Sequence, residues 1–352
     1  MKQIFNLPDP IATTYVPHPR IQEFFNLLEP NFPAWLYDYI NTKEMLHQQY
    51  ISTTCGTIYS NLFESDFFYS NLDHSVGVAL IVWHFTHDKK QTLAGLFHDI
   101  ATPAFKHCVD FMNGDYMTQE STEDLTAEII KNSPEITTLL ARDKIKISEI
   151  DNYHFYPIAD NDTPRLSADR LEYSLSNALF TYKLLNSSEI KTIYQNIEIQ
   201  KGNNGTPELA FKTKKIARQF IKITSTLSII YREDRTRYSM QLMAEILKRL
   251  NVAESIQKSD LYTLKEQEII DIINSSRYSN VFNNWQASTT VKTSKTLPRN
   301  VYYIHQPAKV RYIDPLCQGT RMSKSCKLAK QMIDKNLSYD MDSYVYLNGI
   351  FL

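Results

Sequence analysis

The segment at residues 73–100, "DHSVGVALIVWHFTHDKKQTLAGLFHDI", constrains the fold of this chain most. Two apolar runs flank the polar stretch "THDKKQ" at 86–91, a pattern typical of two buried helices joined by a turn. We expect Asp73 to cap the first helix and Pro103 to limit the second. Two such helices run antiparallel, so the start of the first lies beside the end of the second.

Potential metal ligands gather at that end of the predicted hairpin. His74 begins the first helix, and His98 and Asp99 end the second. Asp169 in "LSADRLEYSLSNALF" is a fourth candidate, because a carboxylate in an apolar-periodic helix is costly unless it is paired or bound to metal. Two histidines and two carboxylates suit a divalent ion, and its identity stays open among Mn, Fe, Zn, Co, Ni and Mg. Such an ion would polarise a phosphoryl oxygen and lower the pKa of a bound water.

The composition predicts a mainly α-helical fold. The 352 residues are 43% hydrophobic and include only 8 glycines, and the apolar stretches follow helical periods. We divide the chain into an N-terminal extension of short helices and loops at 1–45, a helical core at 46–190, and a C-terminal helical region with small β elements at 191–352. A Thr263-x-x-Glu266 capping box predicts one helix start in the last region. Its β elements are a hairpin around Asn204-Gly205 and a small sheet from "NVYYIH", "KVRYI" and "DSYVYLNGIFL".

Charge and cysteine usage exclude several classes of protein. A formal net charge of -1 argues against a surface that binds nucleic acid or an anionic membrane throughout, although a local basic cleft stays possible. The four cysteines form no C-x-x-C pair, which fits neither a disulfide framework nor a zinc ribbon. The longest apolar run, "VGVALIVW" at 76–83, is too short to span a bilayer. We therefore expect a cytoplasmic protein with no membrane partner, and the net charge gives no indication of nucleic-acid binding.

The order of the four candidate ligands, His74, His98-Asp99 and Asp169, resembles the H…HD…D signature of the HD-domain superfamily of metal-dependent phosphohydrolases. The similarity extends to the deoxynucleotide triphosphohydrolase branch, which includes the SAM-and-HD-domain enzymes. Four segments carry it: "DHSVGVA", "LFHDIATPAFKHCVD", "ADRLEYSL" and "KVRYIDPL".

The resemblance implies an HD-domain helical bundle that binds a metal through these four ligands. By the same analogy His107 would approach the substrate phosphates, with Asp110 beside it as hydrogen-bond partner or base. Arg170 and Tyr173 would contact phosphate and sugar, and Lys106 adds a nearby positive charge. The implied reaction converts a deoxynucleoside triphosphate to deoxynucleoside and triphosphate through a metal-activated water. The resemblance also implies a homo-oligomer.

Several family positions carry other residues in this chain: Thr102, Gln119-Glu120, Ser176-Asn177 and Asn71. The metal ligands are kept, whereas groups that transfer protons or contact phosphate are lost. Two alternatives therefore stay open. One is an HD phosphatase or phosphodiesterase acting on another phosphoester, and the other is a nucleotide-sensing or nucleic-acid-binding protein with weak or lost hydrolysis.

Other polar residues have weaker signals. His107 and Asp110 could also form a pair on an exposed helix face, because i, i+3 polar pairs are common there. His154 lies in a polar loop before Asp169 and is expected to be solvated. The basic stripe Lys214, Arg218 and Lys222 is interpreted as a solvated helix face. Arg311 in "KVRYIDPL" could serve the fold or an interface.

Overall fold

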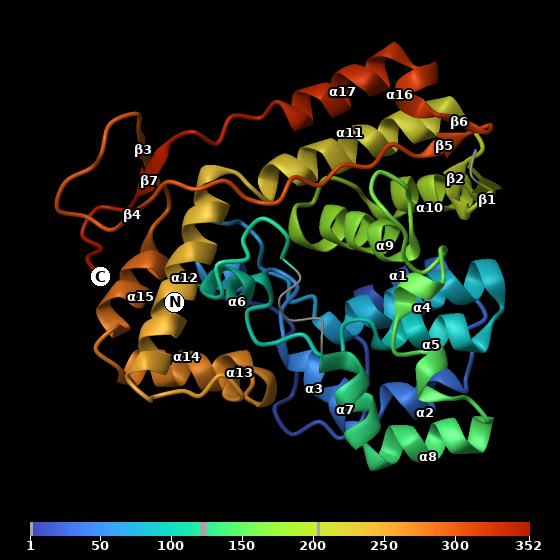
Figure 1. The fold of residues 1–352 in the computed structure, drawn as a ribbon, viewed down its shortest axis with the longest axis horizontal. Coiled ribbons are helices and arrows are strands. Elements are labelled where there is room, and N and C mark those ends of the chain that lie inside the picture. The colour runs from blue at the N-terminus through green and yellow to red at the C-terminus, as the bar shows by residue number, and fades with distance from the viewer. Residues whose placement is uncertain (1–2, 120–124, 203–204) are drawn as a thin grey trace.

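The computed structural model describes residues 3–119, 125–202 and 205–352, and it is mainly α-helical as predicted (Figure 1). Among these residues, no helix has the length and apolar character required to cross a membrane. The helices are α1 (Pro19–Leu28), α2 (Leu36–Ile40), α3 (Lys43–His47), α4 (Asn71–Thr86), α5 (Lys89–Phe97), α6 (His107–Met112), α7 (Thr126–Asn132), α8 (Pro134–Asp143), α9 (Ala168–Ser176), α10 (Ser187–Gln195), α11 (Lys214–Ile230), α12 (Asp234–Val252), α13 (Asp260–Thr263), α14 (Glu266–Ser275), α15 (Ser279–Ala287), α16 (Met322–Ser325) and α17 (Lys327–Leu337).

The strands form two small sheets. One has the order β1-β2-β5-β6 and the other the order β3-β7-β4. Their bounds are β1 (Ile197–Lys201), β2 (Pro207–Phe211), β3 (Lys292–Ser294), β4 (Tyr303–Ile304), β5 (Leu316–Cys317), β6 (Thr320–Arg321) and β7 (Tyr344–Tyr346). β1 and β2 pair antiparallel, which confirms the predicted hairpin, although its turn residue Asn204 lies outside the described residues.

Two of the three predicted segments supply strands to the C-terminal sheet, and its third strand, β3, was not predicted. "NVYYIH" supplies β4 and "DSYVYLNGIFL" supplies β7, and these strands pair antiparallel. The prediction of a strand in "KVRYI" is wrong, because residues 309–313 form a connection between β4 and β5 that has no regular secondary structure. Residues 309–312 are half-buried and Ile313 is buried, and the Ser228 hydroxyl of α11 donates a hydrogen bond to the Arg311 carbonyl.

Helix α4 lies in the interior of the molecule, and its residues from Asn71 to Val82 are all buried. A helix that is apolar on every side belongs inside a core. Ser70 caps it: the Ser70 side chain accepts a hydrogen bond from the Asp73 backbone, and the Asp73 carboxylate accepts one from the Ser70 backbone at 2.8 Å. The prediction that Asp73 is the cap is therefore wrong, because Asp73 is the third helical residue of a capping box.

The predicted hairpin of two buried helices is formed by α4 and α5, which pack along each other (Figure 1). Its turn is shorter than "THDKKQ", since His87 ends α4 in the left-handed region at φ 48° and Asp88 caps α5. Gly95 permits the close approach of the two helices, because a Cβ there would lie 3.3 Å from Val82 Cγ2. The start of α4 and the end of α5 are thus adjacent.

Two hydrophobic cores fill the molecule. The first surrounds α4, α5 and α9 and reaches the N-terminal helix α1 and the long helices α11 and α17. Within it Phe180 stacks between Phe67 and Tyr69. The second core joins α6, α12, α14, α15 and β7. Both cores combine residues from before and after position 190, and the three-segment division of the chain stays a prediction.

Glu266 connects the C-terminal helices to the rest of the molecule. The prediction of a capping box that starts at Thr263 is wrong. Thr263 is the last residue of α13, and α14 begins at Glu266 after Lys265. Glu266 is fully buried, and its carboxylate accepts hydrogen bonds from Ser52 N at 3.1 Å, Phe105 N at 3.2 Å and the Tyr59 hydroxyl at 2.7 Å. This carboxylate therefore holds two loops of the N-terminal half from within the second core.

Burial raises the pKa of Glu266 from its ordinary value of 4.5 to about 7, although the three hydrogen bonds oppose the shift. Between these pH values the folded protein keeps a proton that the unfolded chain has released, so stability falls as pH rises. We expect the free energy of unfolding of the wild type to fall by up to about 3 kcal/mol between pH 4 and pH 8, relative to Glu266→Gln. Urea denaturation across this range measures it, and parallel curves for the two proteins would contradict it.

Candidate metal centre and active site

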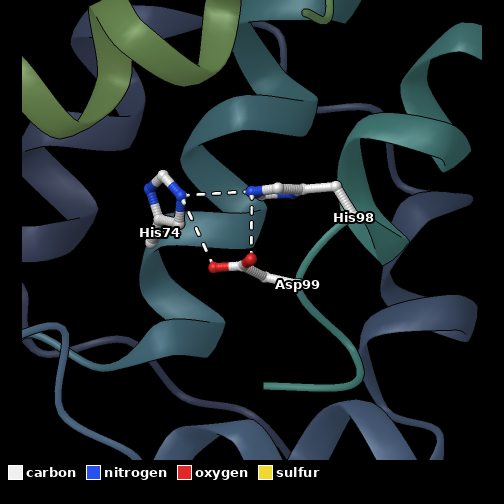
Figure 2. A group of neighbouring side chains, drawn as sticks. All are labelled: His74, His98 and Asp99. Atoms are coloured by element: carbon white, nitrogen blue, oxygen red, sulfur yellow. Dashed lines mark hydrogen bonds and ion pairs between the residues drawn. The ribbon is translucent and has the colours of Figure 1, made fainter. Parts of the chain in front are cut away.

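His74, His98 and Asp99 point toward one another at the end of the α4–α5 hairpin (Figure 2). His74 Nε2 lies 3.2 Å from His98 Nε2 and 3.9 Å from Asp99 Oδ2, and His98 Nε2 lies 3.7 Å from Asp99 Oδ1. One ligand atom from each residue falls within 4.8 Å of the other two. Donors that bind one ion at about 2.1 Å are about 3 Å or more apart, so this group could hold a metal ion.

Asp169 reaches the same place from α9. Its Oδ1 lies 3.2 Å from His74 Nε2 and 3.8 Å from His98 Nε2. His98 Nδ1 lies 2.8 Å from the Gly95 carbonyl, and an Nδ1–H donated there leaves Nε2 available as a ligand. The structure thus brings together all four side chains selected as metal ligands from the sequence.

Glu172 belongs to the candidate site and was not identified from the sequence. Its carboxylate is fully buried beside α4, where it contacts His74 Nδ1 and accepts a hydrogen bond from the Tyr69 hydroxyl at 2.6 Å. Gly77 makes room for it, since a Cβ there would lie 2.8 Å from Glu172 Cγ. The available signal was an acid three residues after Asp169 on the same helix face. By holding Nδ1, Glu172 turns His74 Nε2 toward the other ligands.

The electrostatics of this group favour a bound cation. Burial disfavours a charged imidazole, but Glu172 and Asp169 outweigh it and raise the pKa of His74 to about 10. Burial likewise opposes ionisation of Asp99, yet Lys106 and the histidines hold its pKa well below the usual range. The pKa of Asp169 is also lowered, chiefly by His74 against the effect of burial. A divalent ion would take the place of the His74 proton, so its binding releases that proton.

Lys106 supplies a cation at the edge of this group. Its Nζ lies 2.8 Å from Asp99 Oδ2 and also donates a hydrogen bond to Asn71 Oδ1. Phe105 and Lys106 have φ values of 65° and 45°, in the left-handed region that residues other than glycine rarely adopt. The Phe105 backbone N–H is held by Glu266, which fixes the turn that directs Lys106. Asn71, where the resemblance predicts an arginine, thus binds a lysine from another loop.

His107 and Asp110 are in contact and are not a solvated surface pair. His107 Nδ1 lies 2.9 Å from Asp110 Oδ2, and Asp110 is fully buried. Burial lowers the pKa of His107, and Arg311 lowers it further, while Asp110 opposes the shift. His107 is therefore neutral near pH 7, with Nδ1–H donated to Asp110 and Nε2 directed to Arg311 Nη2 at 3.5 Å.

Arg170 and Tyr173 follow Asp169 on α9. The Arg170 guanidinium donates to Asn161 Oδ1 at 2.8 Å and lies 3.4 Å from Asp160 Oδ1, so it is bound by the polar loop before α9. His154 pairs with the same Asp160 at 2.9 Å. Burial raises the pKa of Tyr173 to about 12. This tyrosine thus remains a neutral hydroxyl near pH 7.

One cavity of about 380 Å³ is lined by the four candidate ligands and by Lys106, His107, His154, Asp160, Arg170, Tyr173 and Arg311. Its walls come from both hydrophobic cores and from the segment between β4 and β5. Such a volume lies within the range of small-molecule sites. Thr102, Gln119, Ser176 and Asn177, where the family pattern is not kept, also line it. Glu120 lies outside the described residues.

The remaining polar candidates divide between cavity and surface. His154 lines the cavity while its side chain stays half exposed, so the expectation of a fully solvated loop histidine is only partly met. Lys214 and Lys222 of the basic stripe are exposed on α11, as predicted for a solvated helix face, whereas Arg218 between them is half-buried. Arg311, whose role the sequence left open, lines the cavity.

The chain is similar to known proteins at low sequence identity. No protein-family model matches it. It is 24% identical over 247 residues to the uncharacterized protein YdhJ of Bacillus subtilis (strain 168), covering 69% of this chain and 72% of YdhJ. A hypothetical protein from Aquifex aeolicus shares its fold with a TM-score of 0.62 and 15% identity, over 90% of this chain and 92% of the other. A phosphohydrolase from Bacteroides thetaiotaomicron has a TM-score of 0.56 and 11% identity, over 98% of each chain.

The contact between Glu172 and His74 leads to a prediction about metal affinity. Glu172→Gln removes the charge that orients and polarises the imidazole, and we expect the affinity for Mn²⁺ or Zn²⁺ to fall about 10- to 100-fold. Isothermal titration calorimetry measures this. Glu23→Gln, which removes the charge of an exposed glutamate on α1, is the matched control and should bind metal as the wild type does. Unchanged affinity in Glu172→Gln would refute the assigned role.

Proposed function

We propose that this protein is a metal-dependent phosphohydrolase that acts on nucleotides, with a deoxynucleoside triphosphate as its substrate and deoxynucleoside plus triphosphate as its products. One observation carries the proposal: a single cavity is lined by four candidate metal-ligand side chains, by several cations and by His107, whose Nδ1 contacts the buried Asp110. The phosphohydrolase from Bacteroides, which has this fold, supports the reaction class. The sequence resemblance supports the nucleotide substrate.

The proposed ion would be held by His74, His98, Asp99 and Asp169. Their mixed nitrogen and oxygen donors fit a first-row divalent metal, and the buried Glu172 behind His74 is the partner that such histidine ligands have in metalloenzymes. When bound, the ion supplies Lewis acidity toward a phosphoryl oxygen and lowers the pKa of water. We infer no particular metal.

The chain's own residues perform the remaining tasks of hydrolysis. Lys106 places an ammonium group beside Asp99, where it offsets the negative charge of a phosphate. His107 is kept neutral with Nε2 toward the cavity, which suits it to accept or give a proton at the substrate. Tyr173 contributes a neutral hydroxyl donor, and Arg170 organises the wall formed by the 151–165 loop.

A second candidate is a nucleotide sensor with weak or lost hydrolysis. Thr102 and Gln119 favour it, because neither side chain transfers protons as the family's histidines would. Gln119 instead accepts a hydrogen bond from Arg311 at 2.6 Å. Such a protein would bind nucleotide and change its assembly without forming product. Hydrolysis of another phosphoester, such as a monophosphate or cyclic nucleotide, is the alternative within the enzyme class.

Removal of one ligand carboxylate distinguishes these functions. We expect the wild type, supplied with Mn²⁺ and separately with other divalent metals, to convert a deoxynucleoside triphosphate to nucleoside and triphosphate. Asp169→Asn should lower kcat/KM at least about 100-fold, because it removes a negative ligand. Anion-exchange chromatography separates the products, and Asp162→Asn, at an exposed aspartate in the loop before α9, is the matched control.

The outcomes separate the candidates. Nucleoside plus triphosphate from the wild type but not from Asp169→Asn supports the triphosphohydrolase. Product from a monophosphate or cyclic nucleotide alone assigns another phosphoester. Nucleotide binding without product under any metal, in protein that holds metal at one ion per chain, assigns the sensor. Light scattering of the same samples tests the predicted homo-oligomer and any change of assembly with nucleotide.

A further inference from the structure

Arg311 belongs to the segment between β4 and β5, which runs beside α11 as the orange ribbon in Figure 1. Its guanidinium lines the same cavity as the candidate metal ligands. Arg311 lies in the C-terminal region of the sequence, whereas the ligands lie in its first half. Arg311 Nη2 donates to Gln119 Oε1 at 2.6 Å and lies 3.5 Å from His107 Nε2. An arginine of the C-terminal region therefore faces the proposed proton-transfer histidine.

The charges in the cavity make Arg311 distinctive. Lys106 is paired with Asp99 at 2.8 Å, and Arg170 with Asp160 at 3.4 Å. Within the described ranges, no carboxylate lies within 4.0 Å of the Arg311 guanidinium, whose polar contacts are to a neutral amide and an imidazole. A half-buried cation without a carboxylate is the group whose charge a bound anion would compensate.

The backbone of Arg311 is held in place from two sides. Its carbonyl accepts hydrogen bonds from the Ser228 hydroxyl of α11 and from Asn336 Nδ2 of α17 at 3.0 Å. Asn336 is fully buried, and its own side-chain oxygen accepts a hydrogen bond from Arg232 Nη2 at 2.6 Å. A guanidinium that is positioned before the ligand arrives loses little conformational entropy on binding.

We propose that Arg311 is a substrate-binding residue whose guanidinium binds a phosphate group beside His107, so that the C-terminal segment completes the active site. The proposal rests on the proposed function and names the phosphate as the moiety bound at this end of the cavity. Arg311 has a planar set of donors, which matches two phosphate oxygens at once. Gln119 holds the guanidinium through Nη2, and no described residue is hydrogen-bonded to Nε or Nη1, which leaves these N–H groups for the anion.

Binding of inorganic triphosphate tests this assignment without any turnover. Calorimetry in EDTA compares the wild type with Arg311→Gln, for which we expect affinity to fall about 10- to 100-fold, the usual effect of losing a charged hydrogen-bond donor. Arg299→Gln is the matched control, because Arg299 is exposed in the loop before β4 and its loss removes the same charge. Thermal denaturation verifies that each variant is folded.

A second variant keeps the test valid if Arg311→Gln fails to fold. Gln119→Glu preserves the shape of the side chain but gives Arg311 a carboxylate partner at the same place. We expect it to weaken triphosphate binding about 10-fold or more while the melting temperature stays the same or rises. Arg311→Lys, which keeps the charge and loses the paired donors, should fall between the wild type and Arg311→Gln.

The results decide the two proposals separately. Triphosphate affinity within twofold of the wild type in both Arg311→Gln and Gln119→Glu overturns the role of Arg311, as does a wild type that shows no triphosphate binding at millimolar concentration. Arg311-dependent binding in a protein that hydrolyses no nucleotide supports the anion site while the proposed function fails. If hydrolysis is found, Arg311→Gln should lower kcat/KM by a factor similar to its loss of triphosphate affinity.

Discussion

The structure depends on how this fold compensates buried negative charge around His74. Glu172, Asp99 and Asp169 all lie near one imidazole at the start of a helix that is buried on every side. Carboxylates in such a place are costly unless cations and hydrogen bonds balance them. Tyr69 and the imidazole itself bind Glu172, and Lys106 pairs with Asp99. The remaining excess of negative charge is what makes this end of the hairpin attractive to a divalent ion.

The sequence predicts well the features that depend on neighbouring residues. The α4–α5 hairpin follows from two apolar runs and a polar turn, and its antiparallel geometry brings His74 close to His98 and Asp99. Glu172 could not be found in this way, because its partner His74 lies 98 residues away. Arg311 is 204 residues from His107. Only tertiary packing creates such pairs, and a single sequence contains no periodicity that records them.

The local errors have a common physical origin. Asp73 and Thr263 both match the pattern of a helix cap, but the cap is decided by which neighbouring side chain reaches the free backbone N–H groups. Ser70 does so at α4. At α14 the acid expected at the third helical position, Glu266, turns inward to bind three donors from distant loops. Glu266 therefore makes buried tertiary hydrogen bonds in place of the expected cap at the helix surface. Local propensity does not predict this exchange.

The two ends of the cavity carry opposite charges, and this difference would orient a bound phosphate chain. Asp99 and Asp169 at the metal end repel phosphate until a divalent ion neutralises them, whereas Arg311 is without a carboxylate among the described residues at the end near His107. A polyphosphate would thus bind first through Arg311 and would reach the ligand carboxylates only with metal present. Under the proposed function, close approach of the scissile phosphate would therefore require the metal, and the C-terminal segment would bind the anion.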